Sequence, residues 1–429
     1  KKEILMNKTL YNEYVRILNE ELLPATGCTE PIAVAYAAAL SREALGKLPE
    51  RVKVLVSGNI LKNVKSVIVP NTGGLKGIAS AAAAGIIAGN PNNKLKVLAF
   101  LTDSERKKIS EFLNTATFSV EQSRTDCAFD ITVSAFHASD CASVRIAGHH
   151  TNVVSIEKNG VRIGGENNTT ESDAGFTDRS VLNVKNIVEF ADSLNIADVQ
   201  DVIENQIACN TAIAREGLKN DYGARVGKIL LATRGNSVFN RAKAFAAAGS
   251  DARMNGCNLP VVIVSGSGNQ GLTTSLPVII YAEELCSSRD NLIRALALSN
   301  LITVHLKTGI GRLSAYCGAV SAGAGAGAGV CYLHGGKYDE IAHTLVNALA
   351  VTSGLICDGA KSSCAAKIAA SVDAGIMGMQ MYESGSQFFG GDGILERGVE
   401  NTIENVCDLA RVGMKETDEE IIRLMIKNI

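Results

Sequence analysis

Three cysteines in the C-terminal half are the residues best suited to do chemistry. Cys317, Cys357 and Cys364 stand in segments that are rich in glycine and alanine and carry few other reactive side chains. A set of thiolates is what a soft metal ion or an iron–sulfur cluster requires. The alternative is that each cysteine packs as a small hydrophobic residue. The Cys-x6-Cys spacing alone favours this alternative, because it matches no standard zinc or ferredoxin pattern.

A loop dense in glycine, serine and amide side chains follows the apolar run at 260–264. Exposed N–H groups in such a loop, together with the N-terminus of the helix expected after it, can hold a carboxylate or a phosphate. The loop contains a Gly-x-Gly-x-x-Gly pattern, but its surroundings are helical, which argues against a dinucleotide site. A tight turn between buried elements is the other interpretation. The residues that we predict to bind a small anion, such as an amino-acid carboxylate, are Ser265, Ser267, Gly268, Asn269 and Gln270.

A similar polar segment at Asn71, Thr72 and Gly73 follows an apolar stretch and precedes a helix expected from Leu75. Its amide, hydroxyl and N–H groups also suit a carboxylate. We predict that these three residues bind substrate, although an ordinary strand-to-helix loop explains the local pattern equally well.

Cys28 and Glu30 lie in a turn that precedes a second expected helix. Thr29 can cap that helix and Pro31 can begin it. Because a helix dipole favours the thiolate of a cysteine at the N-terminus, Cys28 is a candidate ligand, nucleophile or proton carrier. We predict that Cys28 and Glu30 are catalytic, with buried packing of Cys28 as the competing interpretation.

The composition limits the classes of function. The chain has 429 residues, too many for one ordinary core, so two domains are expected. A formal net charge of -2 with 20% charged residues gives no electrostatic footprint for nucleic acid or an anionic membrane. Eleven scattered cysteines indicate a reducing compartment. With no secretory signal and no apolar run long enough to span a bilayer, we expect a cytoplasmic protein.

The pattern along the chain predicts an α+β protein, in which a small α+β domain with a mixed or antiparallel sheet is inserted in a larger all-helical domain. Residues 46–179 form the α+β domain, with alternating strand patterns at 52–57, 94–100, 129–135 and 143–163 and a helix at 75–88. Residues 1–45 and 180–429 form the discontinuous helical domain, whose helices are so rich in glycine and alanine that their backbones should pack closely. The helices expected in this domain lie at 8–23, 32–45, 186–214, 240–248, 273–285, 290–306, 315–333, 341–352, 365–374 and 402–415.

With these residues in view, the chain resembles the L-cysteine desulfidase family over nearly its full length. That family is in turn similar to the iron–sulfur-dependent L-serine dehydratases. The segments that carry the resemblance are Leu22–Ala33, Val69–Gly74, Ser265–Pro277, Leu313–Ala322 and Cys357–Lys367. The resemblance implies a [4Fe–4S] cluster held by Cys317, Cys357 and Cys364, with one iron left open.

The chain departs from the serine dehydratases in three respects. Their last two ligands are spaced farther apart, they carry a Ser-Ser-His-Thr-like motif where this chain has residues 70–74, and some end in a cysteine that reaches the site. This chain ends in Lys427-Asn-Ile429. The base supplied by that histidine is therefore missing, and the hypothesis is that Cys28 takes the place of the terminal cysteine.

The activity that the resemblance implies is β-elimination of L-cysteine to hydrogen sulfide, pyruvate and ammonia. An open iron supplies a Lewis acid for the leaving group, and sulfide is a soft leaving group that iron should accept well. The residues considered as the base are Cys28 as thiolate, Glu30, Lys76 and His305. The alternatives are an L-serine dehydratase, a pyridoxal-phosphate lyase, or a non-catalytic iron–sulfur sensor or electron-transfer protein.

The expected partner is a small amino-acid substrate, with neither nucleic acid nor membrane, and the expected assembly is a homo-oligomer. If the three cysteines hold one cluster, their sulfurs must converge. We expect Cys28 and the loop at 265–271 to border the same cavity.

Overall fold

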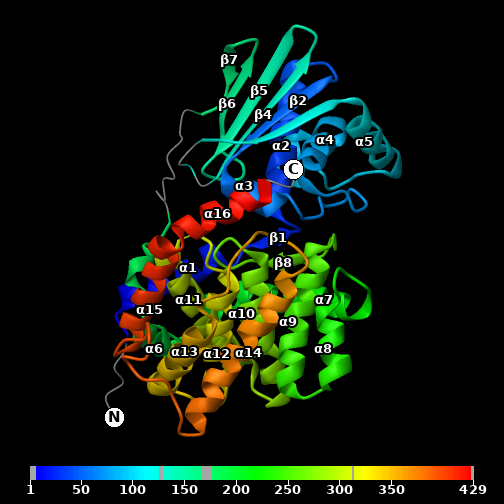
Figure 1. Cartoon of the computed structure of the whole chain (residues 1–429). Coiled ribbons are helices and arrows are strands. Elements are labelled where there is room, and N and C mark those ends of the chain that lie inside the picture. The colour runs from blue at the N-terminus through cyan, green and yellow to red at the C-terminus, as the bar shows by residue number, and fades with distance from the viewer. Residues whose placement is uncertain (1–5, 125–126, 128, 167–175, 312–313, 427–429) are drawn as a thin grey trace.

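The chain folds around two hydrophobic cores, one in a sheet-containing unit and one in a larger helical unit (Figure 1). The computed structural model describes residues 6–124, 127, 129–166, 176–311 and 314–426. Helices dominate and the strands form one mixed sheet and one two-stranded ladder, so the predicted α+β class is confirmed. Among the described residues, no helix combines the length and the apolar character needed to cross a bilayer.

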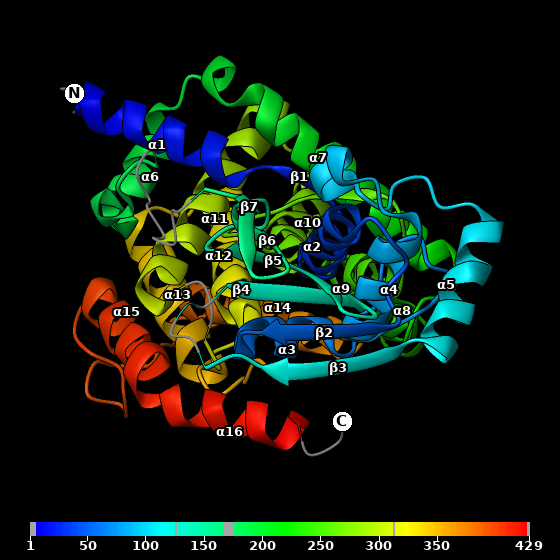
Figure 2. The same cartoon turned by 90° about the horizontal axis from the view of Figure 1, so that it is seen from above.

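The mixed sheet has the order β3-β2-β4-β5-β6-β7, in which β2 and β3 are parallel and the other neighbours antiparallel. Its strands are β2 (Arg51–Val56), β3 (Thr117–Gln122), β4 (Asp130–His137), β5 (Asp140–Ala147), β6 (Val153–Lys158) and β7 (Val161–Gly164). An Asn159-Gly160 turn joins β6 to β7, with positive φ at both residues. The helices of this unit are α2 (Thr29–Leu45), α3 (Gly58–Val64), α4 (Gly77–Ala88), α5 (Asp103–Thr115) and the 3-10 helix η1 (Pro91–Lys96). Helices α2 and α4 cover one face of the sheet (Figure 2).

The helical unit contains the remaining helices. They are α1 (Lys8–Glu21), η2 (Arg179–Val181), α6 (Val184–Ser193), η3 (Ile196–Asp198), α7 (Gln200–Lys219), α8 (Val226–Arg234), α9 (Val238–Met254), α10 (Gly268–Glu284), α11 (Arg289–Ile310), α12 (Gly318–Leu333), α13 (Tyr338–Thr352), α14 (Cys364–Glu383), α15 (Val399–Asp408), the π-helix η4 (Leu409–Gly413) and α16 (Lys415–Ile426). The short ladder pairs β1 (Pro24–Thr26) antiparallel with β8 (Pro260–Val262).

Glycines in α12 bring three helices into close parallel contact. An added Cβ at Gly327 would lie 2.5 Å from the carbonyl oxygen of Gly375 in α14, and Gly323 faces Ser371 one turn earlier in both helices. On another side of α12, Gly325 faces Thr274 of α10 and Gly329 faces Val278, so residue numbers again increase in the same direction along both helices. The contacts advance together along each pair, so α10, α12 and α14 run parallel and begin at the same end of the unit. The glycines of α12 therefore form a packing surface, as the glycine- and alanine-rich composition of these helices predicted.

Two sequence expectations are corrected here. The segment 1–45 was expected to pack with the helical unit, but α2 packs on β4, β5 and α4 and contributes to the core of the sheet unit. An apolar pattern on all sides of a helix predicts burial without indicating which neighbour covers it. The strand expected at 94–100 is also wrong, because Pro91 begins a 3-10 helix there and the adjacent Val97 and Leu98 are both buried, which a strand with one covered face does not allow.

The close contact of α12 with α14 predicts a specific sensitivity. In Gly375→Ala the new methyl group would overlap the carbonyl oxygen of Gly323. The free energy of unfolding should fall by about 2 kcal/mol, although alanine favours helix by about 1 kcal/mol over glycine. Gly354→Ala is the control, because no atom lies within 4 Å of the added Cβ, and it should change stability by less than about 0.5 kcal/mol. Equal denaturation midpoints for the two variants would contradict this account of the packing.

Candidate functional site

A cavity of about 160 Å³ lies where the two units meet. The helical unit supplies most of its wall, and α3 of the sheet unit adds Lys62 and Asn63. The three cysteines, the Cys28 turn and the loop after β8 all border it. Because α10, α12 and α14 begin here, and α2 begins after Cys28, four helix N-termini surround one space. Their partial positive charges favour an anion in the cavity.

Backbone pairing brings Cys317 beside Cys357. Tyr316 and Ile356 form an antiparallel bridge, and the N–H of Cys317 donates to the carbonyl oxygen of Leu355 at 3.0 Å. Cys317 is the N-cap of α12, whereas Cys364 is the first residue of α14. The parallel packing of these two helices therefore brings Cys364 to the same end as Cys317.

The three thiols share one electrostatic environment. A hydrogen bond between Cys317 and Cys357 lowers the pKa of Cys357 and raises that of Cys317. The ammonium groups of Lys62 and Lys307 also lower the pKa of Cys357, against the effect of burial. Burial raises the pKa of Cys364. The pair can thus hold a thiolate that is ready to bind a soft metal.

Another part of the cavity wall comes from the loops that follow β1 and β8. Strand β1 runs into the Gly27-Cys28 turn, and β8 runs into the loop that begins at Ser265. Antiparallel pairing puts these two loops at opposite ends of the short ladder, and both still border the cavity. Ser265, Ser267, Asn269 and Gln270 line the cavity. Gly268 is not part of the described lining and packs against Arg253.

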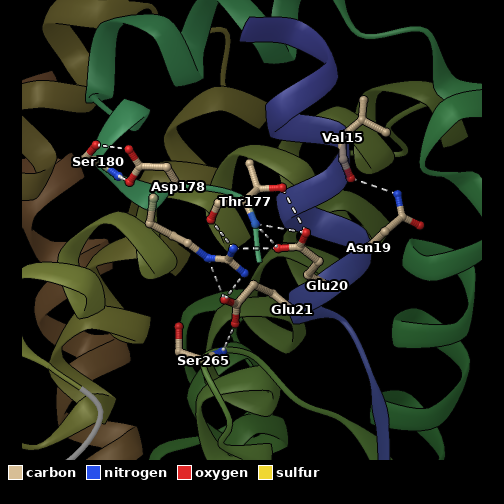
Figure 3. Close-up of polar contacts among 9 residues, drawn as sticks. Val15, Asn19, Glu20, Glu21, Thr177, Asp178, Ser180 and Ser265 are labelled. Atoms are coloured by element: carbon tan, nitrogen blue, oxygen red, sulfur yellow. Dashed lines mark hydrogen bonds and ion pairs between the residues drawn. The ribbon is translucent and has the colours of Figure 1, made fainter. Parts of the chain in front are cut away.

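Ser265 adopts a strained backbone conformation at this wall. Its φ is 47°, and Gly266 follows with φ 73°, which together form a tight reverse turn closed by Val264 and Ser267. A left-handed conformation costs about 1–2 kcal/mol for a residue other than glycine. Glu21 holds Ser265 in place by accepting its N–H at 3.0 Å, and Arg179 binds Glu21 in turn (Figure 3). Strain retained in this way is common at functional sites.

Cys28 and Glu30 form a hydrogen-bonded pair in the cavity wall. The Cys28 thiol is 4% exposed and donates to Glu30 Oε2 at 2.9 Å. Burial, and then the negative charge of Glu30, raise the pKa of Cys28 well above its usual value. Burial and Glu30 thus oppose the thiolate expected for Cys28 from its place at a helix N-terminus. Cys28 is a thiol that can pass a proton to or from Glu30.

Three buried cations in the wall were missed by the sequence analysis. Lys62 pairs with Asp418 of α16 at 2.5 Å, Lys307 lies at the end of α11, and Arg253 lies at the end of α9. Burial lowers the pKa of Lys307 to about 8. Each residue is an ordinary charged position within its own helix, and only the long-range packing brings the three together. In the described part of the wall, Glu30 is the one carboxylate, so the lining favours anionic ligands.

Asn71, Thr72 and Gly73 do not belong to the described lining of the cavity. Thr72 donates its hydroxyl to the carbonyl oxygen of Val69, and the Asn71 amide donates to that of Leu98 at 2.9 Å. The loop is nonetheless close, because an added Cβ at Gly27 would lie 2.7 Å from Pro70. These contacts give the loop a supporting position behind the Cys28 turn, and substrate binding by it stays a prediction.

Two of the proposed bases lie away from the cavity. His305 pairs with Glu400 at 2.7 Å between α11 and α15, and Lys76 precedes α4. Neither side chain is part of the described cavity lining. Leu313, at the start of one of the resembling segments, and the C-terminal Lys427-Asn-Ile429 lie outside the described residues.

Comparison with known proteins identifies the family. The family model for the serine dehydratase alpha chain matches residues 92–423. The chain belongs to the serine dehydratase alpha-chain family. It is also 58% identical over 416 residues to the UPF0597 protein DSY1109 of Desulfitobacterium hafniense, covering 97% of each chain. The UPF0597 protein of Treponema denticola is 44% identical over 429 residues, covering 99% of this chain and all of that protein.

The serine dehydratase alpha-chain family is typically associated with iron–sulfur dehydratases, and the donor set of this cavity fits such a cluster. Among the described residues, no three His, Cys, Asp or Glu side chains are gathered closely enough to bind a single metal ion. A four-iron cluster is larger and bonds each thiolate through a different iron, so its ligands lie farther apart. Three thiols on one wall, two buried ammonium groups beside them and the helix N-termini together suit an anionic thiolate-bound cluster.

The ion pair between Lys62 and Asp418 predicts a large effect on stability. The Lys62 side chain is 1% exposed, so Asp418→Ala would leave a buried ammonium without its carboxylate. The free energy of unfolding should fall by about 3 kcal/mol. The control is Asp140→Ala, which breaks the exposed pair with Lys47 and should cost less than about 1 kcal/mol. Denaturant unfolding of both variants checks this, and similar losses for the two would contradict a buried role for the Lys62 ion pair.

Proposed function

We propose that the protein is an L-cysteine desulfidase, which converts L-cysteine to hydrogen sulfide, pyruvate and ammonia. The observation that carries the proposal is the single cavity that combines the three thiols with the Cys28–Glu30 pair and a loop suited to a carboxylate. Membership of the serine dehydratase alpha-chain family supports the same class of reaction, β-elimination from a small amino acid.

Cys317, Cys357 and Cys364 would hold the [4Fe–4S] cluster that the resemblance implies. When bound, a cluster with an open iron supplies a Lewis acid for the leaving group. A soft sulfur leaving group suits iron better than a hydroxyl group does. Lys62 and Lys307 offset the negative charge of the thiolates from within the protein.

The protein's own residues would handle the protons. Glu30 is the one carboxylate of the described wall, and it would take the α-proton while the Cβ–S bond breaks and hydrosulfide leaves with the bonding electrons. The product, 2-aminoacrylate, then tautomerises and hydrolyses to pyruvate and ammonia. The Cys28 thiol holds Glu30 in place through the 2.9 Å hydrogen bond and can exchange a proton with it.

L-serine dehydratase is the second candidate function, because the family model that matches the chain is that of a serine dehydratase. The two activities share the cavity, the α-proton and the products apart from the leaving group. They differ in whether sulfide or water departs.

The proposal predicts a preference between substrates. Anaerobically reconstituted protein should form sulfide and pyruvate from L-cysteine at equal rates, and its kcat/KM for L-cysteine should exceed that for L-serine by about tenfold or more, since thiolate needs less protonation to leave. The measurement is sulfide and pyruvate release with each substrate. Faster turnover of L-serine would favour the dehydratase, and no turnover of either by protein with a full cluster would contradict both candidates.

The ligand assignment predicts a matched loss of iron and activity. Serine in place of Cys357 should abolish the visible absorbance of the cluster together with sulfide release, because a hydroxyl group is a poor ligand for iron in a cluster. Cys286→Ser is the control, since Cys286 is exposed, follows the C-terminal end of α10 and is not part of the described cavity lining. It should retain about four irons per chain. Full iron content in Cys357→Ser would contradict the assignment.

A further inference from the structure

Arg253 is a buried guanidinium group in the cavity wall whose partners carry no charge. The residue is 8% exposed and lies in the last turn of α9. Its Nη1 donates to Asn269 Oδ1 at 3.3 Å, and its Nη2 donates to the carbonyl oxygen of Gly27 at 3.2 Å. Nε has no hydrogen-bond acceptor among the described residues, and no described carboxylate pairs with the group. Two of five N–H donors are thus used, both by neutral oxygens.

A buried guanidinium group without a charged partner is stabilised when an anion binds beside it. A buried charge without a counter-charge is strongly unfavourable, and the one carboxylate in the described wall, Glu30, accepts from Cys28 rather than from Arg253. The N-terminus of α10, which begins beside Asn269, adds partial positive charge at the same place. A guanidinium group can bind a carboxylate through two parallel hydrogen bonds. Such charge-assisted bonds are stronger than those that Arg253 makes to its neutral partners.

The backbone around Arg253 is shaped to hold it against the cavity. An added Cβ at Gly268 would lie 2.8 Å from Arg253 Cζ, so only glycine allows the guanidinium group to pack on the loop. Gly27 has a φ of 66°, and its carbonyl oxygen is the acceptor for Nη2. Arg253 therefore joins the Cys28 turn to the loop at 265–271.

We propose that Arg253 binds the α-carboxylate of the amino-acid substrate. This inference rests on the proposed function, and it names the carboxylate site as Arg253 with the Ser267–Asn269 loop. Lys62 is already paired with Asp418, and Lys307 lies on the side of Cys317 and Cys357. The carboxylate at Arg253 therefore directs the β-substituent toward the thiols. Gln270 Oε1, which is buried in the wall without a partner among the described residues, is placed to accept from the α-ammonium group.

The test compares two ligands that differ in the carboxylate alone. L-alanine and ethylamine both lack a leaving group, and only L-alanine has a carboxylate. Calorimetry with the reconstituted enzyme should give a dissociation constant for L-alanine at least about tenfold below that for ethylamine. Arg253→Gln should remove this preference, and Arg253→Lys should retain part of it, since lysine keeps the charge but lacks the planar pair of donors.

Arg241→Gln is the matched control, because Arg241 lies in the first turn of the same helix and pairs with Glu284 at the surface. It should keep the full preference for L-alanine. A second variant, Asn269→Asp, tests the same site if Arg253→Gln folds poorly or loses iron. Its new carboxylate would pair with Nη1 and compete with the ligand, so binding of L-alanine should weaken while that of ethylamine does not.

An unchanged preference for L-alanine in Arg253→Gln or in Asn269→Asp would overturn the proposal. This binding test can fail or succeed independently of the test for the elimination reaction. If the enzyme turns over neither cysteine nor serine but the preference for L-alanine depends on Arg253, the proposed function fails and the carboxylate site stands. If turnover occurs and the preference does not depend on Arg253, the proposed function stands and the carboxylate site fails.

Discussion

The close parallel packing of α10, α12 and α14 is the constraint on which the site depends. Side chains at Gly323, Gly327 or Gly375 would collide with the backbone of the neighbouring helix, so these positions set the distance between the helices. Interior glycines weaken an isolated helix, and tertiary packing must therefore impose the helical form. This close packing has a geometric consequence, because helices packed in this register all begin at one cavity. Cys317 and Cys364 occupy the first positions of two of them.

The converging helix ends give the cavity a positive potential, and the buried cations increase it. The pKa values of the thiols in this cavity shift in different directions, depending on the charged groups beside each thiol. Cys357 lies beside Cys317 and two ammonium groups, and its pKa falls, whereas Cys28 lies beside the carboxylate of Glu30, and its pKa rises. The cavity thus separates a side suited to thiolate ligands from a side suited to holding a proton. Groups whose pKa values are shifted in opposite directions within one cavity are typical of catalytic sites.

The sequence predicts the local parts of the site well, because their signals are local. The loop at 265–271, the turn at Cys28 and the helices that follow Cys317 and Cys364 are all recognisable from glycine, proline and capping residues. Arg253 and Lys62 could not be identified, since each is a single charged residue in a helix, and packing between distant segments brings it into the cavity wall. The assignment of α2 to the helical unit failed for the same reason. Asn71 and Thr72 resemble a binding loop in composition, yet their side chains satisfy nearby carbonyl groups.

The sheet unit completes the cavity and is not simply attached to it. Gly359, in the loop between Cys357 and Cys364, has a φ of 94°, and a side chain there would collide with the backbone of Lys62. The loop that carries two of the thiols thus rests directly on α3. Helix α16 crosses from the helical unit to α3, where Asp418 binds Lys62 and Ile422 packs into the sheet-unit core beside Gly58 (Figure 1). Moving the units apart would take Lys62 and Asn63 out of the wall and leave Asp418 without its partner. The same buried contacts therefore hold the two units together and keep the charge of the cavity in place.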